Sequence, residues 1–163
     1  WSSDVCSSDL ATVRLAHAVI PQMKVRHSGG IISVSSIAAF QPLPLMATYA
    51  ATKAFNFFHS VALREELRPF GVKVLTLCPG PTATEFGGVA RVPGTISGVS
   101  RDSAEMVVRK TLQAFATSKQ VYLITGIRSK FLAFVSKILP FSWTSYFVGR
   151  GLKKTLDSSI RSK

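Results

Sequence analysis

The stretch from Ile31 to Lys53, IISVSSIAAFQPLPLMATYAATK, constrains the fold of this chain more than any other. It starts with a short β-branched run that ends in Ser35 and Ser36, and a loop with prolines at 42 and 44 follows. A short apolar run of this kind is typical of a strand buried on both faces of a parallel sheet. A long helical pattern from Met46 to Arg68 comes next, so the stretch predicts the strand, loop and helix of an α/β fold.

Tyr49 and Lys53 lie four residues apart in that predicted helix and therefore share one of its faces. An ammonium held near a phenol favours the phenolate and lowers the phenol's pKa from its reference of about 10. A tyrosine tuned in this way can exchange a proton near neutral pH, as general acid–base catalysis requires. Ser36, thirteen residues before Tyr49, can hydrogen-bond the same reacting oxygen. An isolated Tyr-x-x-x-Lys pair is weak evidence, because most such pairs lie on a solvated helix face.

A second apolar strand, predicted at Val72–Cys78, ends in a Pro-Gly-Pro turn and strengthens this interpretation. The ordered set GGIISVSS, YAATK and VKVLTLCPGPTATEF resembles the short-chain dehydrogenase/reductase family, in its single-domain subclass. The strong match covers residues 29–86, and a looser one covers residues 11–127. The resemblance implies a Rossmann-like fold, a doubly wound parallel sheet, of which this chain lacks the N-terminal half.

The resemblance also implies an NAD(P)-dependent oxidoreductase that acts on a carbonyl or an alcohol. Ser36 would orient the carbonyl oxygen, Tyr49 would exchange its proton, and Lys53 would assist Tyr49 and bind the cofactor's ribose. The turn after the second strand would meet the nicotinamide. Cofactor contacts are thus expected from Tyr49, Lys53, Pro79, Gly80, Thr82 and Thr84. The sequence does not discriminate between NADP and NAD, and no metal site is expected.

Two departures from the family concern the start of the chain. Relatives carry a catalytic asparagine thirteen residues before a helix-ending proline, and this position is Ser8 here. No Gly-rich turn that could cradle a pyrophosphate precedes Ala11. We therefore expect residues 1–10 to be foreign to the fold and residues 11–127 to be the C-terminal, catalytic half of the domain. We expect the chain on its own to be inactive or nearly so.

The remaining elements are predicted from periodicity and punctuation. Residues 11–26 form a helix, residues 102–116 an amphipathic helix, and residues 120–124 a last short strand. The loop 41–45 is expected to form one wall of the substrate pocket. The Gly-rich segment 85–100 is predicted to be a lid or an irregular loop.

The C-terminal region carries much of the net charge of +12: residues 128–163 hold eight Lys or Arg and one acid, Asp157. A basic, aromatic-rich amphipathic segment at residues 128–156 suggests peripheral contact with a membrane interface. Contact with protein, over the active site or a dimer face, is the alternative. Similar tails in relatives that reduce acyl substrates imply an apolar or lipid-like carbonyl substrate. Nucleic acid is not expected as a partner.

Partners and location complete these expectations. Relatives pair two helices between subunits, which here predicts a homo-oligomer formed through residues 11–26 and 46–68. The two cysteines, Cys6 and Cys78, provide no disulfide framework, so a reducing, cytoplasmic setting is expected. Two alternative functions stay open: a sugar-nucleotide epimerase or dehydratase, and a non-catalytic, membrane-associated interaction protein on the same scaffold.

Overall fold

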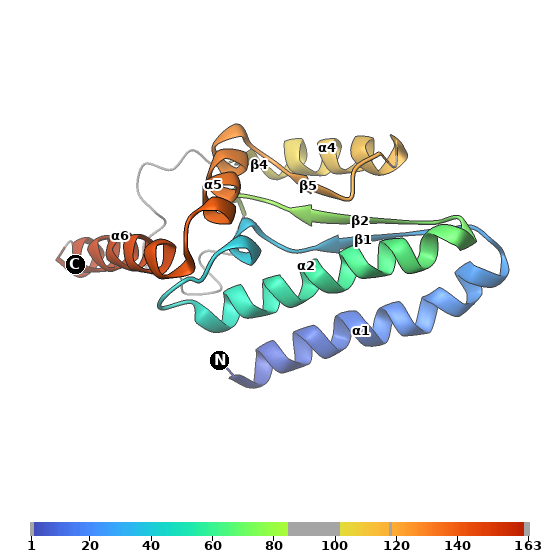
Figure 1. The fold of residues 1–163 in the computed structure, drawn as a ribbon, viewed down its shortest axis with the longest axis horizontal. Coiled ribbons are helices and arrows are strands. Elements are labelled where there is room, and N and C mark those ends of the chain that lie inside the picture. Colours follow the sequence, from blue (N-terminus) through green and yellow to red (C-terminus); the bar gives the residue numbers. More distant parts are fainter. Residues whose placement is uncertain (1, 85–101, 118, 162–163) are drawn as a thin grey trace.

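The computed structural model describes residues 2–84, 102–117 and 119–161 (Figure 1). The elements follow in the order α1 (Ser2–Val25), β1 (Gly29–Val34), η1 (Ile37–Phe40), α2 (Ala47–Leu67), η2 (Arg68–Phe70), β2 (Val72–Cys78), β3 (Thr82–Ala83), β4 (Asp102–Ser103), α4 (Ala104–Thr117), β5 (Tyr122–Ile124), α5 (Ile127–Ile138) and α6 (Phe141–Arg161). The two elements labelled η are short 3₁₀-helices. The lid or loop predicted for residues 85–100 lies outside the described residues.

A parallel sheet with the strand order β1-β2-β5 forms the centre of the fold. β1 and β2 pair in parallel from Gly29 opposite Val72 to Val34 opposite Leu77. β5 runs parallel along the other side of β2, where Cys78 lies opposite Ile124. The segments β3 and β4 form a separate, parallel two-stranded pair.

Helices cover both faces of this sheet, with α1 and α2 on one face and α4 on the other (Figure 1). Two adjacent glycines at the start of β1 allow this close packing. A Cβ on Gly29 would collide with the side chain of Met23 in α1, and a Cβ on Gly30 would collide with Phe115 in α4. The arrangement confirms the predicted doubly wound, Rossmann-like α/β fold, of which the chain forms a part.

The core lies between β2, α1 and α2. Leu67, Val72 and Val74 form its buried cluster. Partly buried hydrophobic side chains pack against this cluster: Ile20, Met23, Ile31 and Phe70. Every residue of β2 except Lys73 is buried, as expected for a central strand of a parallel sheet.

β1 differs from the prediction of a strand buried on both faces of the sheet. Ile32 and Val34, on the face that α4 covers at Gly30, are 36% and 53% exposed. β1 lies at an edge of the described sheet, and α4 packs over the start of the strand but not over its end. The prediction of a fully buried strand is therefore confirmed for β2 and wrong for β1.

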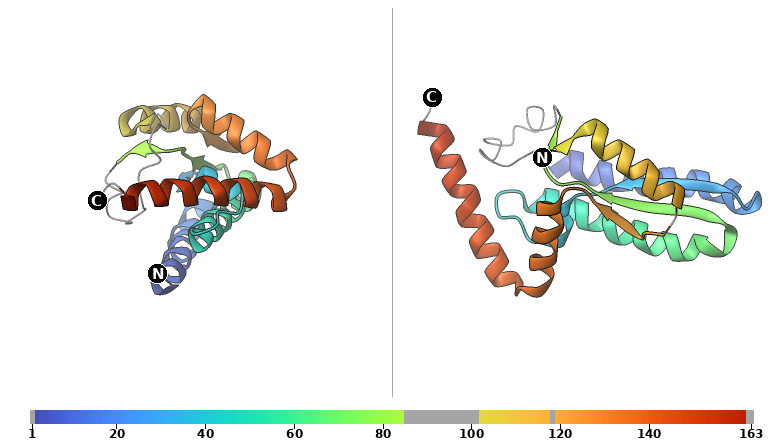
Figure 2. Two further views of the ribbon diagram at one scale, coloured as in Figure 1. Left: turned by 90° about the vertical axis from the view of Figure 1, so that its left-hand side faces the viewer. Right: turned by 90° about the horizontal axis from the view of Figure 1, so that it is seen from above.

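The ends of the described chain also differ from expectation. α1 begins at Ser2, whereas a helix was predicted only from residue 11. Its continuation past Pro21 to Val25 agrees with the predicted range. Residues 2–10 contain no glycine or proline that would end a helix. The C-terminal region consists of two helices instead of one segment, because Pro140 disfavours helical geometry at Leu139. α6 then extends away from the sheet (Figure 2).

Candidate functional site

The predicted catalytic residues lie at the carboxyl ends of β1 and β2, next to η1 and the first turns of α2 (Figure 1). In open α/β sheets this edge forms the ligand-binding crevice. α2 packs against η1 and against both strands, which brings its N-terminal turns to the crevice. Residues at the ends of β1, η1, α2 and β2 thus lie at one edge of the sheet.

Ser36 is buried and held by its neighbours on both sides. The backbone N–H of Ser35 donates to Leu77 at 2.7 Å, and that of Ile37 donates to Pro79 at 3.1 Å. These bonds place Ser36 alongside the end of β2. Its hydroxyl oxygen caps η1 by accepting from the N–H of Ala38 at 3.1 Å. A hydroxyl that accepts one hydrogen bond can still donate its own proton to a substrate oxygen.

Lys53 is anchored to the end of β1 at both its side chain and its main chain. Its Nζ donates to the carbonyl of Val34 at 3.2 Å, and Ser35 Oγ donates to the carbonyl of Lys53 at 2.6 Å. Burial lowers the pKa of the Lys53 amine below its usual 10.5, while the charge of Asp9 partly opposes this shift. Spacing along the sequence does not predict the contact between Ser35 and Lys53, because these residues lie eighteen positions apart and meet only through packing.

Tyr49 and Lys53 are brought together as the helical spacing predicts. The Lys53 amine lies 5.9 Å from the centroid of the half-buried Tyr49 ring. The amine therefore lies between the phenol and the end of β1 instead of extending into bulk water. A hydroxyl, a phenol and an ammonium at one crevice are suited to moving a proton to or from a substrate oxygen.

The Pro-Gly-Pro turn after β2 lies next to Ser36, because the carbonyl of Pro79 accepts the hydrogen bond from the N–H of Ile37. Gly80 approaches α5 so closely that a Cβ on it would collide with Ser129. Thr82 Oγ1 donates to the carbonyl of Gly80 at 3.0 Å, so this hydroxyl stabilises the turn itself. Pro79 is partly buried and Thr84 is exposed. Four of the predicted cofactor contacts, Pro79, Gly80, Thr82 and Thr84, thus lie in or directly after one turn.

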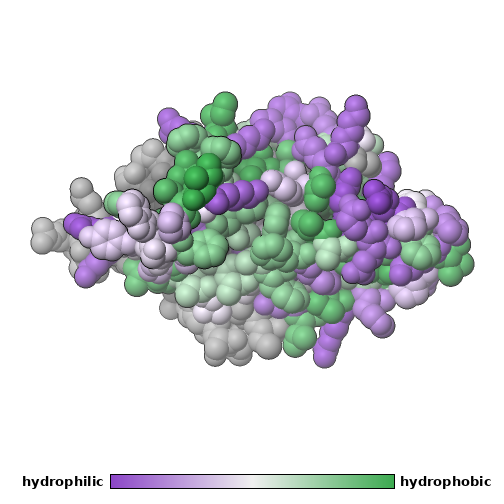
Figure 3. Space-filling view, viewed as in Figure 1, coloured by the Kyte–Doolittle hydropathy of each residue, from purple (hydrophilic) through white to green (hydrophobic). Residues whose placement is uncertain are grey.

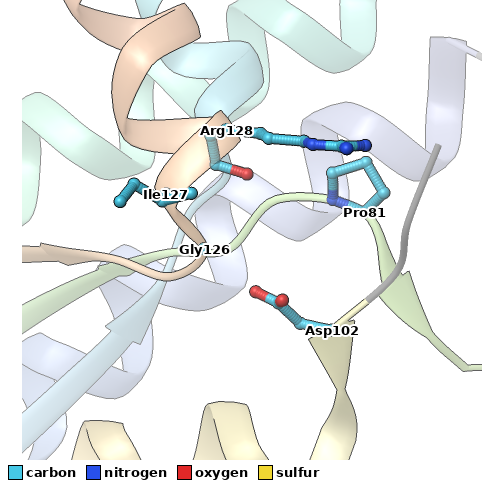
Figure 4. Close-up of a pocket in the computed structure, with 6 residues that line it drawn as sticks. Pro81, Asp102, Gly126, Ile127 and Arg128 are labelled. Atoms are coloured by element: carbon cyan, nitrogen blue, oxygen red, sulfur yellow. The ribbon is translucent and has the colours of Figure 1, made fainter.

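A cavity of about 210 Å³ opens on the far side of this turn (Figure 4). Its lining comes from the turn, β4 and the start of α5: Pro81, Asp102, Gly126, Ile127, Arg128 and Ser129. The Asp102 carboxylate points toward Gly126, where a Cβ would lie only 2.9 Å from Asp102 Oδ2. The φ of 77° at Gly126 also favours glycine. None of Ser36, Tyr49 and Lys53 lines this cavity. This cavity was not predicted from the sequence, and Gly126, two residues after β5, is the signal that could have indicated it.

Comparisons with known proteins agree with this architecture. The Very-long-chain 3-oxoacyl-CoA reductase of Ajellomyces capsulatus (strain NAm1 / WU24) is 32% identical over 152 residues, covering 93% of this chain and 44% of the relative. The protein of the same name from Mus musculus is 27% identical over 156 residues, covering 94% and 47%. A solved structure, the short-chain dehydrogenase from Sphingobium yanoikuyae in complex with NADPH, is 30% identical with a TM-score of 0.67. This match covers 77% of our chain and 49% of that one.

The chain therefore spans about half the length of the curated relatives that it matches. The family profile described as short chain dehydrogenase matches residues 8–92, which is more than half of the 163 residues. The parallel sheet covered on both faces and the likeness to the Sphingobium yanoikuyae structure support the same assignment. On this evidence, the chain belongs to the short chain dehydrogenase family.

Proposed function

We propose that the protein containing this chain is an NAD(P)-dependent reductase of long-chain 3-oxoacyl thioesters. The observation that supports this most strongly is the double anchoring of Lys53 beside Tyr49, at the crevice that also holds Ser36. The substrate class comes from the names of the relatives, the Very-long-chain 3-oxoacyl-CoA reductases. The sheet edge, the lysine and the Pro-Gly-Pro turn fit the nicotinamide half of a dinucleotide, which is also the ligand class of the NADPH-bound neighbour.

The reaction follows from the three side chains. A bound nicotinamide cofactor supplies a hydride to the carbonyl carbon. The Ser36 hydroxyl donates a hydrogen bond to the carbonyl oxygen and fixes its position. The Tyr49 hydroxyl transfers its proton to this oxygen as negative charge develops on it. The Lys53 ammonium stabilises the resulting phenolate, and its anchoring to β1 keeps it in place throughout.

The test uses the longest reading frame that contains this chain, because the chain spans about half of its relatives. NADPH oxidation is followed spectroscopically with a long-chain 3-oxoacyl-CoA as substrate. Tyr49→Phe is expected to lower kcat by about 10²- to 10⁴-fold, the usual contribution of general acid–base catalysis. Full turnover by the Tyr49→Phe variant would reject the proposal.

The same variant separates the reductase from its alternatives. A non-catalytic interaction protein on this scaffold would keep its biological activity after Tyr49→Phe, whereas a reductase would lose it. A sugar-nucleotide epimerase or dehydratase would convert a nucleotide sugar and leave acyl-CoA unchanged. We also propose that the 163-residue chain alone is inactive or nearly so, and NADPH-dependent turnover by this chain would contradict that part.

We further propose that the protein is a homo-oligomer through α1 and α2. Both helices carry large apolar side chains that are exposed in the single chain, among them Leu15, Val19, Phe55 and Phe58. Phe58→Arg is expected to shift the sedimentation coefficient toward that of a smaller species, and an unchanged coefficient would argue against this interface.

A cytoplasmic location, and a peripheral membrane contact through residues 128–156, belong to the same proposal. The free, buried thiol of Cys78 is compatible with a reducing compartment.

A further inference from the structure

α5 has the reverse of the usual amphipathic pattern. Its buried residues, Ser129, Ala133 and Ser136, are small and mostly polar. Its opposite face carries a continuous apolar stripe at helical spacing: Ile127 (85% exposed), Phe131 (70%), Phe134 (62%) and Ile138 (65%). A helix of a soluble domain normally buries such a stripe against its own core. Figure 3 shows hydrophobic side chains gathered over α5, next to a hydrophilic one.

The small residues of α5 are explained by what lies beneath the helix. Ser129 packs against Gly80. Ser136 Oγ lies 2.7 Å from Gln41 Oε1 and 2.8 Å from the carbonyl oxygen of Leu132, and its single proton can be donated to either acceptor. The helix is therefore docked onto the crevice by its polar face. Turning it over to bury the apolar stripe would break these contacts, so the stripe is held outward.

The first turns of α6, which follow α5 after Pro140, also expose large apolar side chains. Trp143, Tyr146 and Phe147 are exposed, whereas Thr144 is buried and Gly149 approaches Pro44. Tryptophan and tyrosine combine an apolar ring with a polar atom, which suits the boundary between lipid and water. We call the stripe of α5 together with Trp143 and Phe147 the apolar surface.

Basic residues accompany the apolar surface, and acidic ones are missing from its sequence. Residues 127–156 contain six Lys or Arg and no Asp or Glu. Lys130 and Arg128 lie on opposite borders of the α5 stripe, by the helical period of 3.6 residues. Two copies of such a surface would repel each other by charge, which disfavours a second copy of this chain as the occupant.

We infer that the apolar surface docks onto the headgroup region of a bilayer that contains anionic lipids. Apolar rings can enter the acyl boundary while Lys and Arg side chains extend to the phosphates. Because an amphipathic helix lies in the plane of the interface, the inferred contact is parallel to the membrane surface. No described helix is long and apolar enough to cross a bilayer. This inference deepens the membrane contact proposed above and does not depend on the proposed reaction.

One consequence does rest on the proposed function. α5 is bonded to Gln41 and α6 approaches Pro44, so both helices hold the loop that was predicted to form a substrate wall. Docking of the apolar surface would bring this loop close to the lipid. A long acyl chain could then reach the crevice without crossing water.

Vesicle flotation tests the docking, with vesicles of phosphatidylcholine alone and of phosphatidylcholine with about 30% phosphatidylserine. The protein is expected to float with the anionic vesicles only, and less at high salt. Phe131→Ser/Phe134→Ser is expected to weaken binding at least about tenfold, because two buried rings are lost. Val108→Ser/Leu112→Ser on α4 is the matched control, because it also removes two exposed apolar side chains, and it is expected to bind as the unchanged protein does.

Charge is tested separately by Lys130→Glu/Lys153→Glu, which is expected to weaken binding to anionic vesicles about tenfold or more. Circular dichroism verifies that each variant is folded. Equal flotation with both vesicle types, or undiminished flotation of the two-phenylalanine variant, overturns the inference. A dimer that forms without vesicles and that Phe131→Ser/Phe134→Ser dissociates would also overturn the inference, because the apolar surface would then be a protein interface.

Tryptophan fluorescence tests whether α6 takes part in the docking. The emission of Trp143 is expected to shift to shorter wavelength on anionic vesicles, and Trp143→Phe is expected to abolish the shift. An absent shift removes α6 from the apolar surface. NADPH-dependent activity in detergent-free buffer is measured in parallel, so that failure of docking and failure of the reductase proposal are distinguishable.

Discussion

α2 and α5 both border the candidate site, and both bury small and polar residues, but only α2 also buries large apolar side chains. α2 buries Phe57 and Leu67 and holds a charged lysine at the sheet edge. α5 buries small and polar residues such as Ser136 and exposes phenylalanines such as Phe131. The described chain buries Phe57 and Leu67 of α2, whereas it leaves Phe131 and Phe134 of α5 exposed.

The difference separates two kinds of effect that substitutions near one site can have. A change on the inner face of α2 should alter folding or chemistry wherever the protein is. A change on the outer face of α5 should leave both intact and alter only what the protein binds. Paired substitutions on the two helices therefore test the comparison directly.

The largest effect is expected from the lysines. Lys53→Met removes the ammonium beside Tyr49 and should lower kcat by about 10²- to 10⁴-fold, like loss of the general acid itself. Lys130→Met on α5 removes an exposed charge far from this pair in the chain and should leave kcat within about twofold of the unchanged protein. Both are measured by NADPH oxidation with an acyl-CoA substrate in the full-length protein. Equal losses for the two variants would mean that α2 has no special role.

Stability should show the next largest contrast. Leu67 is fully buried, and Leu67→Ala should lower the free energy of unfolding by about 2.7–5 kcal/mol. Phe131 is largely exposed, and Phe131→Ala should change the free energy of unfolding by at most about 0.5 kcal/mol, although it removes more atoms than Leu67→Ala does. Urea unfolding in the absence of lipid measures both values. A loss of several kcal/mol for Phe131→Ala would show that α5 packs against the protein after all.

The sequence predicted α2 better than it predicted the C-terminal helices, for a physical reason. The bounds of β2 agree with the prediction, and α2 runs from Ala47 to Leu67 against an expected 46–68. Both elements have a periodic pattern that their own packing satisfies. The exposed end of β1 and the orientation of α5 depend on which neighbours are present. No local pattern in the sequence contains this information.

The sequence likewise predicted some contacts of the candidate site and not others. Tyr49 and Lys53 were predicted to meet because one helical period joins them, and they do. The roles of Ser36, Tyr49 and Lys53 in catalysis, and those of the turn in cofactor binding, stay predictions. The anchoring of Lys53 by Ser35 joins two elements, and the cavity at Gly126 joins three, so neither follows from spacing alone.

A smaller effect is expected at Ser35. Ser35→Ala removes the hydroxyl that donates to the Lys53 carbonyl and should lower the free energy of unfolding by about 1–3 kcal/mol, since the site is buried. It should also lower kcat, because the lysine loses its main-chain anchor. Ser142→Ala on α6, at an exposed position, is the matched control and should change neither quantity. A stable Ser35→Ala variant with full activity would reduce this serine to a packing role.

The smallest effect concerns Cys78, where the two regions meet. Burial raises the pKa of its thiol to about 12, while the Ser35 hydroxyl and the Lys137 charge act in the opposite direction. Its reference pKa is 9.0, so above pH 9 the unfolded chain releases this proton and the folded chain keeps it. The contribution of Cys78 to stability should therefore fall between pH 9 and 12, by at most about 1.4 kcal/mol per pH unit. Lys53 acts in the opposite direction, because its lowered pKa makes the folded state more favourable as the pH rises toward 10.5.

The measurement is consequently a difference between urea midpoints of the Cys6→Ser and Cys6→Ser/Cys78→Ala variants at pH 8 and pH 10. A difference that does not change with pH would show that the Cys78 thiol is less buried than its place at the end of β2 requires.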